Sequence, residues 1–342
     1  MKREPDFNRL KKVLQLQGEP DVVPFYELFA DREVISKVLG RPYQDLKDRI
    51  EFQYKLGYDF VTLWARIHLP MQGAAVTEDT APLSRGKRAF RTASMCTIAT
   101  WEDFENYPWP QVTPEAFIEL DRAAKEMPDG MKGIVLTGHV LEDPMGLMGY
   151  EGLSYAMVDN PDLVEAVFDR VGRLYEEIYR YCVQHEAVGA MLISDDLGFR
   201  SGTMISPKDL RRLVFPWYKR YCEICHAYDK PVILHSCGNL REIIDDLVDC
   251  GIDAKHSYED IIMPVEEAKQ LFGDRMAILG GLDVDFLCRA TEEEVRARTR
   301  EILEACMPGG GYALGTGNSV ANYIPTENYL AMLDEGRKIG VY

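Results

Sequence analysis

The chain has 342 residues, of which 46% are hydrophobic and 28% charged, a composition typical of globular proteins and not of disordered tails, collagen-like fibres or disulfide-rich miniproteins. It contains 39 Lys and Arg residues and 56 Asp and Glu residues, so the formal net charge is −17. Because proteins that bind duplexes or bilayer surfaces need a clustered basic face, this charge argues against nucleic-acid and membrane partners.

Short apolar, β-branched runs alternate along the chain with longer amphipathic stretches. The pattern predicts eight strands, at residues 21–27, 59–65, 133–139, 188–194, 231–236, 252–256, 276–281 and 311–315. A helix is predicted after Asn160 and Pro161, where apolar residues recur at helical spacing up to Cys182. Eight such units, without a GxGxxG after the first strand, favour the α/β class and one (β/α)8 TIM barrel over residues 1–342.

Two segments lie outside this repeat. Residues 1–20 are expected to form an N-terminal helical lid, and residues 66–130 are polar and Gly-containing, so we interpret them as an insertion after the second strand that covers the active site. The N-terminus lacks the pattern of a secretory signal, which predicts a cytoplasmic location. The eight cysteines are therefore expected to be free thiols or metal ligands.

The sharpest local motif is ILHSCGNL, residues 233–240, in which His235 and Cys237 stand two positions apart at the end of a predicted strand. Side chains at i and i+2 of an extended chain project from the same face, so an imidazole and a thiolate would both point into the barrel mouth. Zinc takes these ligand types. The alternative is a buried histidine that hydrogen-bonds beside an apolar cysteine, and the pair alone leaves both readings open.

Acidic residues at other strand ends supply the remaining candidates. Glu259 follows the next strand and is a candidate metal ligand and catalytic group, with His256 as a second candidate ligand. Asp195 and Asp196 end another strand, and because adjacent side chains alternate, we expect one to act as a catalytic or orienting carboxylate while the other caps the turn. Each of these carboxylates could instead be a solvated or helix-capping group.

Several further side chains are expected to contact a substrate because they lie at or just beyond predicted strand ends. These are Tyr26, Glu27, Trp64, Arg66, His139, Asp283 and Asn318. The segment CEICH, 222–226, matches a haem-attachment pattern, but it lies within helical apolar spacing and we interpret it as ordinary helix.

Four segments together resemble the uroporphyrinogen decarboxylase superfamily, and the likeness extends over nearly the whole chain. They are PFYELFAD (24–31), ISDDLGFRSGTMISP (193–207), VILHSCGNLREIIDDLVDCGIDA (232–254) and ILGGLDVDFL (278–287). The resemblance implies a (β/α)8 barrel, in agreement with the periodicity.

Within that superfamily the resemblance favours the cobalamin-dependent methyltransferase branch. True decarboxylases carry an arginine-bearing segment after the first strand, where this chain reads FYELFADRE. The methyltransferase branch implies zinc, a partner corrinoid protein that carries cobalamin, and a small methoxy, methylamine or thiol compound, as in O-demethylases. Its zinc-using members add a later cysteine to the HxC pair. This chain has Thr316 in that place, so the third ligand stays open, with Glu259 as the substitute.

Two other functions remain as alternatives. The chain could be a decarboxylase-like carboxy-lyase that needs no cofactor, or a non-catalytic barrel that binds a small molecule. The sequence leaves open the methyl donor, the direction of transfer and the oligomeric state, including a homodimer.

Overall fold

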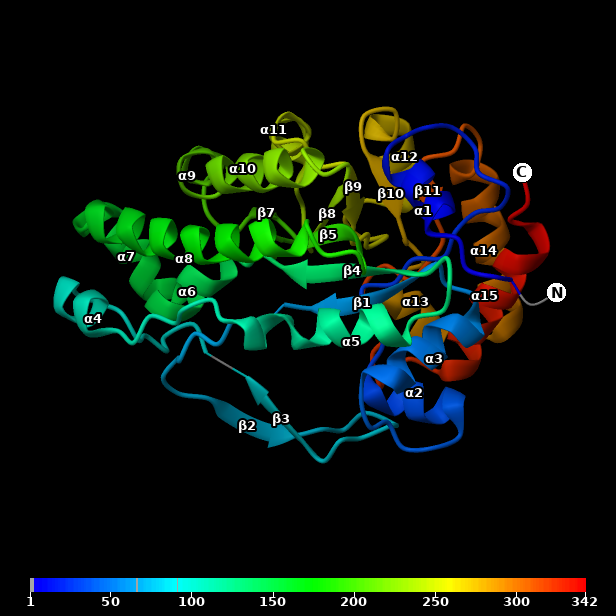
Figure 1. Ribbon diagram of the computed structural model, residues 1–342, viewed down its shortest axis with the longest axis horizontal. Helices are drawn as coiled ribbons and strands as arrows, with labels where there is room; N and C mark the ends of the chain where they lie inside the picture. Colours follow the sequence, from blue (N-terminus) through cyan, green and yellow to red (C-terminus); the bar gives the residue numbers. More distant parts are fainter. Residues whose placement is uncertain (1–2, 66, 91) are drawn as a thin grey trace.

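A parallel sheet of seven strands forms the centre of the computed structural model, which describes residues 3–65, 67–90 and 92–342 (Figure 1). The order across the sheet is β1–β4–β5–β8–β9–β10–β11, and every neighbouring pair is parallel. The strands are β1 (Phe60–Trp64), β4 (Lys132–Thr137), β5 (Val188–Ser194), β8 (Val232–His235), β9 (Ala254–His256), β10 (Ala277–Leu279) and β11 (Tyr312–Ala313). Each strand overlaps a predicted one, so the α/β class is confirmed.

The predicted strand at 21–27 is wrong as a regular element. This segment makes isolated bridges, one parallel from Phe25 to Leu314 and one antiparallel from Val22 to Val341. The Tyr26 amide donates to the Leu314 carbonyl, and the Leu314 amide donates to the Pro24 carbonyl. Since proline has no amide proton, Pro24 cannot extend this ladder by one more bond. Closure into an eight-stranded barrel therefore stays a prediction.

Helices link the successive strands and cover the sheet (Figure 1). The connecting helices are α5 (Ile118–Glu126), α8 (Pro161–Cys182), α10 (Phe215–His226), α11 (Ile244–Asp249), α12 (Val265–Phe272) and α14 (Glu292–Cys306). The others are α1 (Phe7–Leu14), α2 (Arg32–Leu39), α3 (Leu46–Leu56), α4 (Trp101–Asn106), α6 (Glu142–Met148), α7 (Tyr150–Asp159), α9 (Pro207–Leu213), α13 (Val284–Arg289) and α15 (Thr326–Ile339), with short 3-10 turns η1 (Pro114–Phe117) and η2 (Arg241–Ile243).

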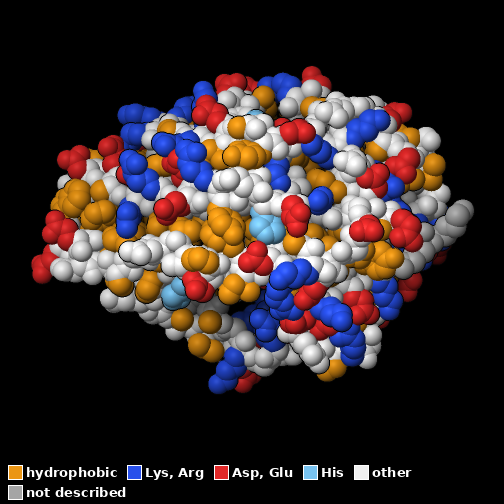
Figure 2. All heavy atoms as spheres, viewed as in Figure 1, with side chains coloured by type: hydrophobic (Ala, Val, Ile, Leu, Met, Phe, Trp, Pro, Cys, Tyr) orange, Lys and Arg blue, Asp and Glu red, His pale blue; other side chains and the backbone are white. Residues whose placement is uncertain are grey.

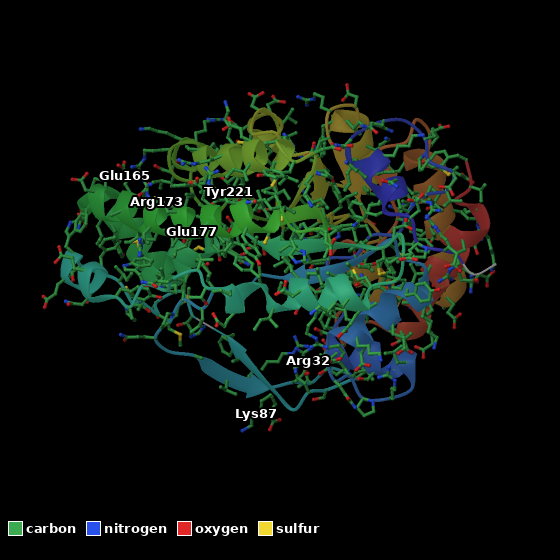
Figure 3. All side chains as sticks on the ribbon, in the orientation of Figure 1. Arg32, Lys87, Glu165, Arg173, Glu177 and Tyr221 are labelled. Carbon is green, nitrogen blue, oxygen red and sulfur yellow. The ribbon has the colours of Figure 1, made fainter. Side chains whose placement is uncertain are left out.

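The helix predicted after Asn160 is confirmed as α8, with Pro161 as its first residue. Its apolar face packs against α10, and Tyr221 of α10 donates a hydrogen bond to the Gly172 carbonyl at 2.8 Å. Figure 3 labels Tyr221 beside this helix. Gly172 allows the close approach, because a Cβ there would lie 2.2 Å from the ring of Trp217. The contact between the two helices therefore depends on the missing side chain.

Replacing Gly172 by alanine is expected to lower the free energy of unfolding by about 1–3 kcal/mol, the usual cost of overpacking a core. The measurement is chemical denaturation. The matched control is Gly152→Ala in α7, where the added Cβ meets its nearest neighbour, Cys96 Sγ, at an ordinary 3.8 Å. Since alanine is the better helix former, Gly152→Ala should raise stability by up to about 1 kcal/mol. A stabilising Gly172→Ala would contradict the packing described here.

The N-terminal segment forms helix α1, at the end of the sheet where the strands begin. The Phe7 amide donates to the carbonyl of Gly130, just before β4, and Arg9 pairs with Asp59, just before β1. This position is opposite to the strand ends that carry the candidate site. The helix expected within residues 1–20 is present, but it covers the far end of the sheet.

The segment 66–130 contains two different parts. The antiparallel hairpin of β2 (Ala75–Glu78) and β3 (Lys87–Phe90) and helix α4 depart from the strand–helix repeat, as expected of an insertion. Helix α5, in contrast, packs on α3 and β1 and is the ordinary connection from β1 to β4. The insertion therefore ends before residue 118, because the amphipathic stretch 118–126 buries its apolar face like the other connecting helices.

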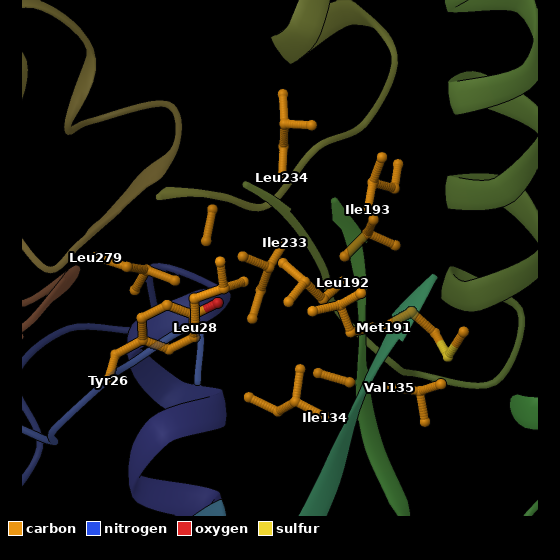
Figure 4. Close-up of a cluster of buried hydrophobic side chains, with 14 of the residues drawn as sticks. Tyr26, Leu28, Ile134, Val135, Met191, Leu192, Ile193, Ile233, Leu234 and Leu279 are labelled. Carbon is orange, nitrogen blue, oxygen red and sulfur yellow. The ribbon is translucent and has the colours of Figure 1, made fainter. Parts of the chain in front are cut away.

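Side chains of the sheet meet in one buried apolar cluster (Figure 4). The residues labelled there are Tyr26, Leu28, Ile134, Val135, Met191, Leu192, Ile193, Ile233, Leu234 and Leu279. Runs such as VILH in β8 are buried throughout, as expected for strands covered on both faces. This packing fixes the strand ends from which the site is built.

Acidic and basic side chains intersperse on the surface viewed in Figure 2. Within the part of the chain that the structure describes, none of the helices combines the length and the apolar content needed to span a bilayer.

Candidate metal centre

The candidate site lies at the C-terminal ends of three neighbouring strands. Ser194, His235 and His256 are aligned as partners across β5, β8 and β9. Asp196 and Cys237 follow two residues after the first two of these positions, so the parallel register brings both loops to the same edge. Strand ends of this kind are where α/β barrels carry their functional groups.

Asp196, His235 and Cys237 form a cluster whose ligand atoms all lie within 4.8 Å of one another, the one such group found among the described residues. Cys237 Sγ is 3.7 Å from His235 Nε2, and Asp196 Oδ1 is 4.0 Å from the same nitrogen. Ligands of a tetrahedral zinc are about 3.5 Å apart, given metal bonds of about 2.0–2.3 Å. The sulfur, nitrogen and oxygen atoms therefore fit zinc in both chemistry and spacing.

Backbone contacts lock the two loops of this cluster together. The Cys237 amide donates to Asp196 Oδ1 at 2.8 Å, so Asp196 is turned toward the cysteine. Among the described residues, the structure brings Asp196, rather than Glu259, into the group with His235 and Cys237. Asp196 thereby becomes the third candidate ligand, and Glu259 stays a prediction from its place just after β9 in the sequence.

A second histidine supports the first. His256 is completely buried, and its Nδ1 lies 2.8 Å from Nδ1 of His235. Its other nitrogen, Nε2, lies 3.0 Å from the carbonyl oxygen of Thr316. These contacts occupy both ring nitrogens of His256. In the structure His256 therefore forms hydrogen bonds and is not placed as the metal ligand that the sequence suggests as a second candidate.

The loop after β11 completes the surroundings of the cysteine. Asn318 Nδ2 donates to Cys237 Sγ at 3.2 Å. The loop is anchored by Glu27, which accepts hydrogen bonds from the Thr316 amide at 2.9 Å and the Thr316 hydroxyl at 2.5 Å. The sequence predicts substrate contacts for both Glu27 and Asn318; in the structure Glu27 is buried and its carboxylate holds this loop.

Two backbone features keep these loops close. Gly315 passes so near Tyr26 that a Cβ would lie 1.7 Å from the Tyr26 carbonyl oxygen. Ser257, directly after β9, adopts a φ of +142°, a strained conformation for a side-chain-bearing residue. Its hydroxyl donates to the Gly317 carbonyl at 2.8 Å, and its carbonyl accepts from the buried Lys255 ammonium at 2.6 Å. No periodicity or motif in the sequence singles out Ser257 or Lys255.

Burial controls the protonation of the whole site. It raises the pKa of Cys237 to about 12, with the Asp196 carboxylate acting in the same direction, and it also raises the pKa of Asp196. Burial lowers the pKa of His235 well below its ordinary value, that of His256 to about 3 and that of Lys255 to about 8. A bound dication would reverse this tendency for the thiol and carboxyl groups.

Asp195 points away from the cluster, as alternation along an extended chain requires. It is completely buried and accepts the amide protons of Leu141 at 2.7 Å and Glu142 at 2.8 Å, together with the Tyr218 hydroxyl at 2.8 Å. Burial raises its pKa to about 8, and the nearby Glu142 charge adds to the effect. Of the two expected roles for this pair, Asp195 has the capping one and Asp196 faces the site.

The other expected contact residues are spread more widely. Tyr26 is fully buried, with its ring 5.0 Å from that of His256. Trp64 is half-buried at the end of β1. The guanidinium carbon of Arg49 lies 4.1 Å from the centre of its ring.

Arg66 lies outside the described residues. His139 follows β4, and its Nδ1 lies 3.4 Å from Oε2 of Glu142. Burial alone would lower the pKa of His139, but this contact and the nearby carboxylates raise it to about 9.

A cavity of about 620 Å³ adjoins the cluster through Asn318. Glu259 and Asp283 line it, together with Phe286 and Tyr323. Asp283, expected to bind substrate, accepts the Phe286 and Asp260 amides and so caps helix α13. The structure therefore brings His235, Cys237, Asp196 and Asn318 into one site and gives Asp195, Glu27 and Asp283 structural contacts.

Sequence comparisons show which family the chain resembles. The sequence model of the family described as Uroporphyrinogen decarboxylase (URO-D) matches residues 94–339. A methylated-thiol–coenzyme M methyltransferase of Methanosarcina mazei is 29% identical over 242 residues, which cover 66% of this chain and 60% of that protein. A methylcobamide:CoM methyltransferase MtaA of Methanosarcina barkeri is 24% identical over 66% of this chain and 62% of that protein. The chain thus aligns with about 60% of the length of these two relatives.

A uroporphyrinogen decarboxylase of Anaeromyxobacter dehalogenans is 23% identical over 93% of this chain and 88% of that protein. Among solved structures, a methyltransferase from Methanosarcina mazei superposes with a TM-score of 0.70 and 19% identity, covering 96% of this chain and 97% of the other. At this identity the likeness establishes the shared fold.

Proposed function

The chain belongs to the uroporphyrinogen decarboxylase family, a family of enzymes, and from this premise we propose that it is a corrinoid-dependent methyltransferase. It would move a methyl group between a small methoxy, methylamine or thiol compound and cobalamin carried by a separate corrinoid protein. The names of two relatives, a methylated-thiol and a methylcobamide methyltransferase, support this branch.

The observation that carries the proposal is the Asp196–His235–Cys237 cluster. These three side chains would hold a zinc ion, since they offer one thiolate, one imidazole and one carboxylate at distances that suit tetrahedral zinc. Three protein ligands leave a fourth position for a substrate atom, as in catalytic zinc sites. When bound, zinc supplies Lewis acidity to the heteroatom that loses or gains the methyl group.

The chain's own residues prepare this chemistry. Asn318 donates an N–H to Cys237 Sγ, which favours the thiolate form of the cysteine. Asp196 is held in place by the Cys237 amide, and His235 by its contact with His256.

The cavity next to Asn318 is the proposed substrate position, and Trp64 and His139 stay predicted substrate contacts. We also propose that the β2–β3 hairpin covers the site, because Asp79 and Leu83 beside it bond to Asn322, shortly after Asn318.

Zinc content and methyl transfer together test the proposal. Protein purified without an affinity tag or added metal should contain about one zinc per chain. Mixed with a reduced corrinoid protein and a panel of methoxy, methylamine and methylthiol compounds, it should methylate the cobalt with at least one of them, as followed by the visible spectrum. Absence of zinc even after supplementation would contradict the metal site. Absence of methyl transfer with every compound of the panel, both to the corrinoid protein and from it, would contradict the activity.

The identity of the third ligand has its own prediction. Asp196→Asn keeps the oxygen that accepts the Cys237 amide but removes the anionic ligand, so the zinc dissociation constant should rise about 10–100-fold, as measured by competition with a chelator. Glu259→Gln is the matched control and should change this constant by less than about threefold. The reverse ranking would show that Glu259, the candidate named from the sequence, completes the site.

Decarboxylation is the second candidate, because the uroporphyrinogen decarboxylase of Anaeromyxobacter dehalogenans aligns with more of this chain than the two methyltransferases do. It requires no metal, so incubation with uroporphyrinogen decides between the two. We expect no release of carbon dioxide; metal-independent release that survives Cys237→Ser would establish the decarboxylase instead.

A further inference from the structure

His256 is a buried titratable group to which the proposed chemistry assigns a contact with His235 but no ligand or substrate role. It ends β9, is completely inaccessible to solvent, and contacts His235 through one ring nitrogen and Thr316 through the other. Its ring also meets the edge of Tyr26, with 5.0 Å between centroids. The imidazole is therefore held on several sides and has little freedom to turn.

The hydrogen-bond partners dictate where the ring protons lie. A backbone carbonyl can only accept, so His256 Nε2, 3.0 Å from the Thr316 oxygen, must carry a proton. Among the described residues, the ring nitrogens of His256 contact His235 and the Thr316 carbonyl and no carboxylate, so the buried ring is neutral and its Nδ1 has a lone pair. That lone pair accepts the proton on Nδ1 of His235, 2.8 Å away.

The consequence reaches the metal cluster. With its proton fixed on Nδ1, neutral His235 presents the lone pair of Nε2, the nitrogen that lies 3.7 Å from Cys237 Sγ and 4.0 Å from Asp196 Oδ1. This is the only neutral tautomer in which the nitrogen that faces the other two donors can bind a cation. The opposite tautomer would aim an N–H at them.

We propose that His256 is a positioning residue, which sets the tautomer and the ring orientation of His235 through the Thr316 carbonyl. The chain of contacts begins at Glu27, because its two bonds to Thr316 fix the loop from which that carbonyl projects. The same loop carries Asn318, whose amide bonds to Cys237. One loop thus orients two of the three donors. The inference rests on the proposed function for the identity of the metal, whereas the protonation of His235 does not depend on it.

The first test is nitrogen-15 NMR of the metal-free full-length protein labelled on histidine. The resonances of His235 are assigned by comparison with His235→Gln. We expect His235 to be protonated at Nδ1 and unprotonated at Nε2, and His256 to show the opposite pattern. A proton on Nε2 of His235 in the wild type would overturn the proposal, whether or not any variant folds.

Two variants of His256 then separate positioning from packing. His256→Leu removes the acceptor, so the Nδ1–H tautomer of His235 should lose its dominance and the zinc dissociation constant should rise about 10–100-fold. His256→Asn places a carbonyl oxygen where Nδ1 now accepts, and it should restore the tautomer and bring zinc binding within about fivefold of the wild type. If the asparagine variant fails as badly as the leucine variant, or if leucine leaves the tautomer unchanged, the proposal is wrong.

The two readouts also separate this proposal from the proposed function. A wild-type protein that binds no zinc contradicts the methyltransferase mechanism, while the tautomer of His235 still decides the role of His256. A protein that binds zinc with His235 protonated on Nε2 in its metal-free form contradicts the role of His256 alone.

Discussion

Replacing His235 by alanine, or Cys237 by serine, is expected to lower kcat/KM for methyl transfer by about three orders of magnitude. Each change removes one of three donors that lie within 4.8 Å of one another, and with it the stabilisation that the proposed metal would give to the departing heteroatom. A loss of about 4 kcal/mol of transition-state stabilisation corresponds to that factor, at about 1.4 kcal/mol per tenfold. The rate is measured as methylation of the corrinoid cobalt at substrate concentrations below KM.

The matched control for this prediction is Cys288→Ser. Cys288 is also a free thiol in a half-buried position, but it lies on α13, with its sulfur 4.0 Å from the Tyr323 carbonyl and outside the metal cluster. Its replacement should leave both zinc content and rate within about twofold of the wild type. Full activity in folded His235→Ala or Cys237→Ser protein would remove the metal-assisted mechanism.

Asp195→Ala is expected to have the largest effect on stability, lowering the free energy of unfolding by about 4 kcal/mol. The substitution leaves the Leu141 and Glu142 amides and the Tyr218 hydroxyl without their acceptor in a fully buried position. Each buried donor left unsatisfied costs about 1–3 kcal/mol. The measurement is urea denaturation followed by circular dichroism.

A catalytic role for Asp195 predicts a different result from the structural role, and stability and rate measurements separate the two roles. Under the catalytic role the alanine variant would stay stable and lose its rate. Under the structural role, the fraction of Asp195→Ala protein that remains folded at low temperature should bind the proposed zinc as the wild type does, because Asp196 and its contact with Cys237 are untouched. Asp195→Asn serves as a second variant, since it keeps one oxygen acceptor and should destabilise the protein less.

The sequence predicts the strand ends well because their residue types are strongly constrained. Seven buried runs are too apolar and β-branched for loops, and the spacing between them leaves room for helices. His235 and Cys237 can also be predicted from the sequence as parts of one site, because side chains two positions apart on an extended chain share a face. At 21–27 the missing amide proton of Pro24 prevents the ladder from extending by one bond on its N-terminal side, although the neighbouring residues have strand-like composition.

The rest of the site depends on contacts between distant segments. Sequence alternation shows that only one of Asp195 and Asp196 can face the site, but the choice is made by the Cys237 amide, 41 residues further on. The role of His256 depends on the register that sets it opposite His235, and on a carbonyl of Thr316 that has no sequence signature. Glu259 is near the right strand end, yet no local rule tells that its side chain lines the neighbouring cavity.

The anchoring of the site by Glu27 and Thr316 has a consequence for biosynthesis. These two residues are 289 positions apart, and Asn318 is 81 positions beyond the cysteine to which it bonds. During translation His235 and Cys237 leave the ribosome before the loop that orients them has been made. In a nascent chain these donors therefore lack their fixed positions, and firm binding of the proposed metal would have to wait until residue 318 has been made and the early and late segments have met.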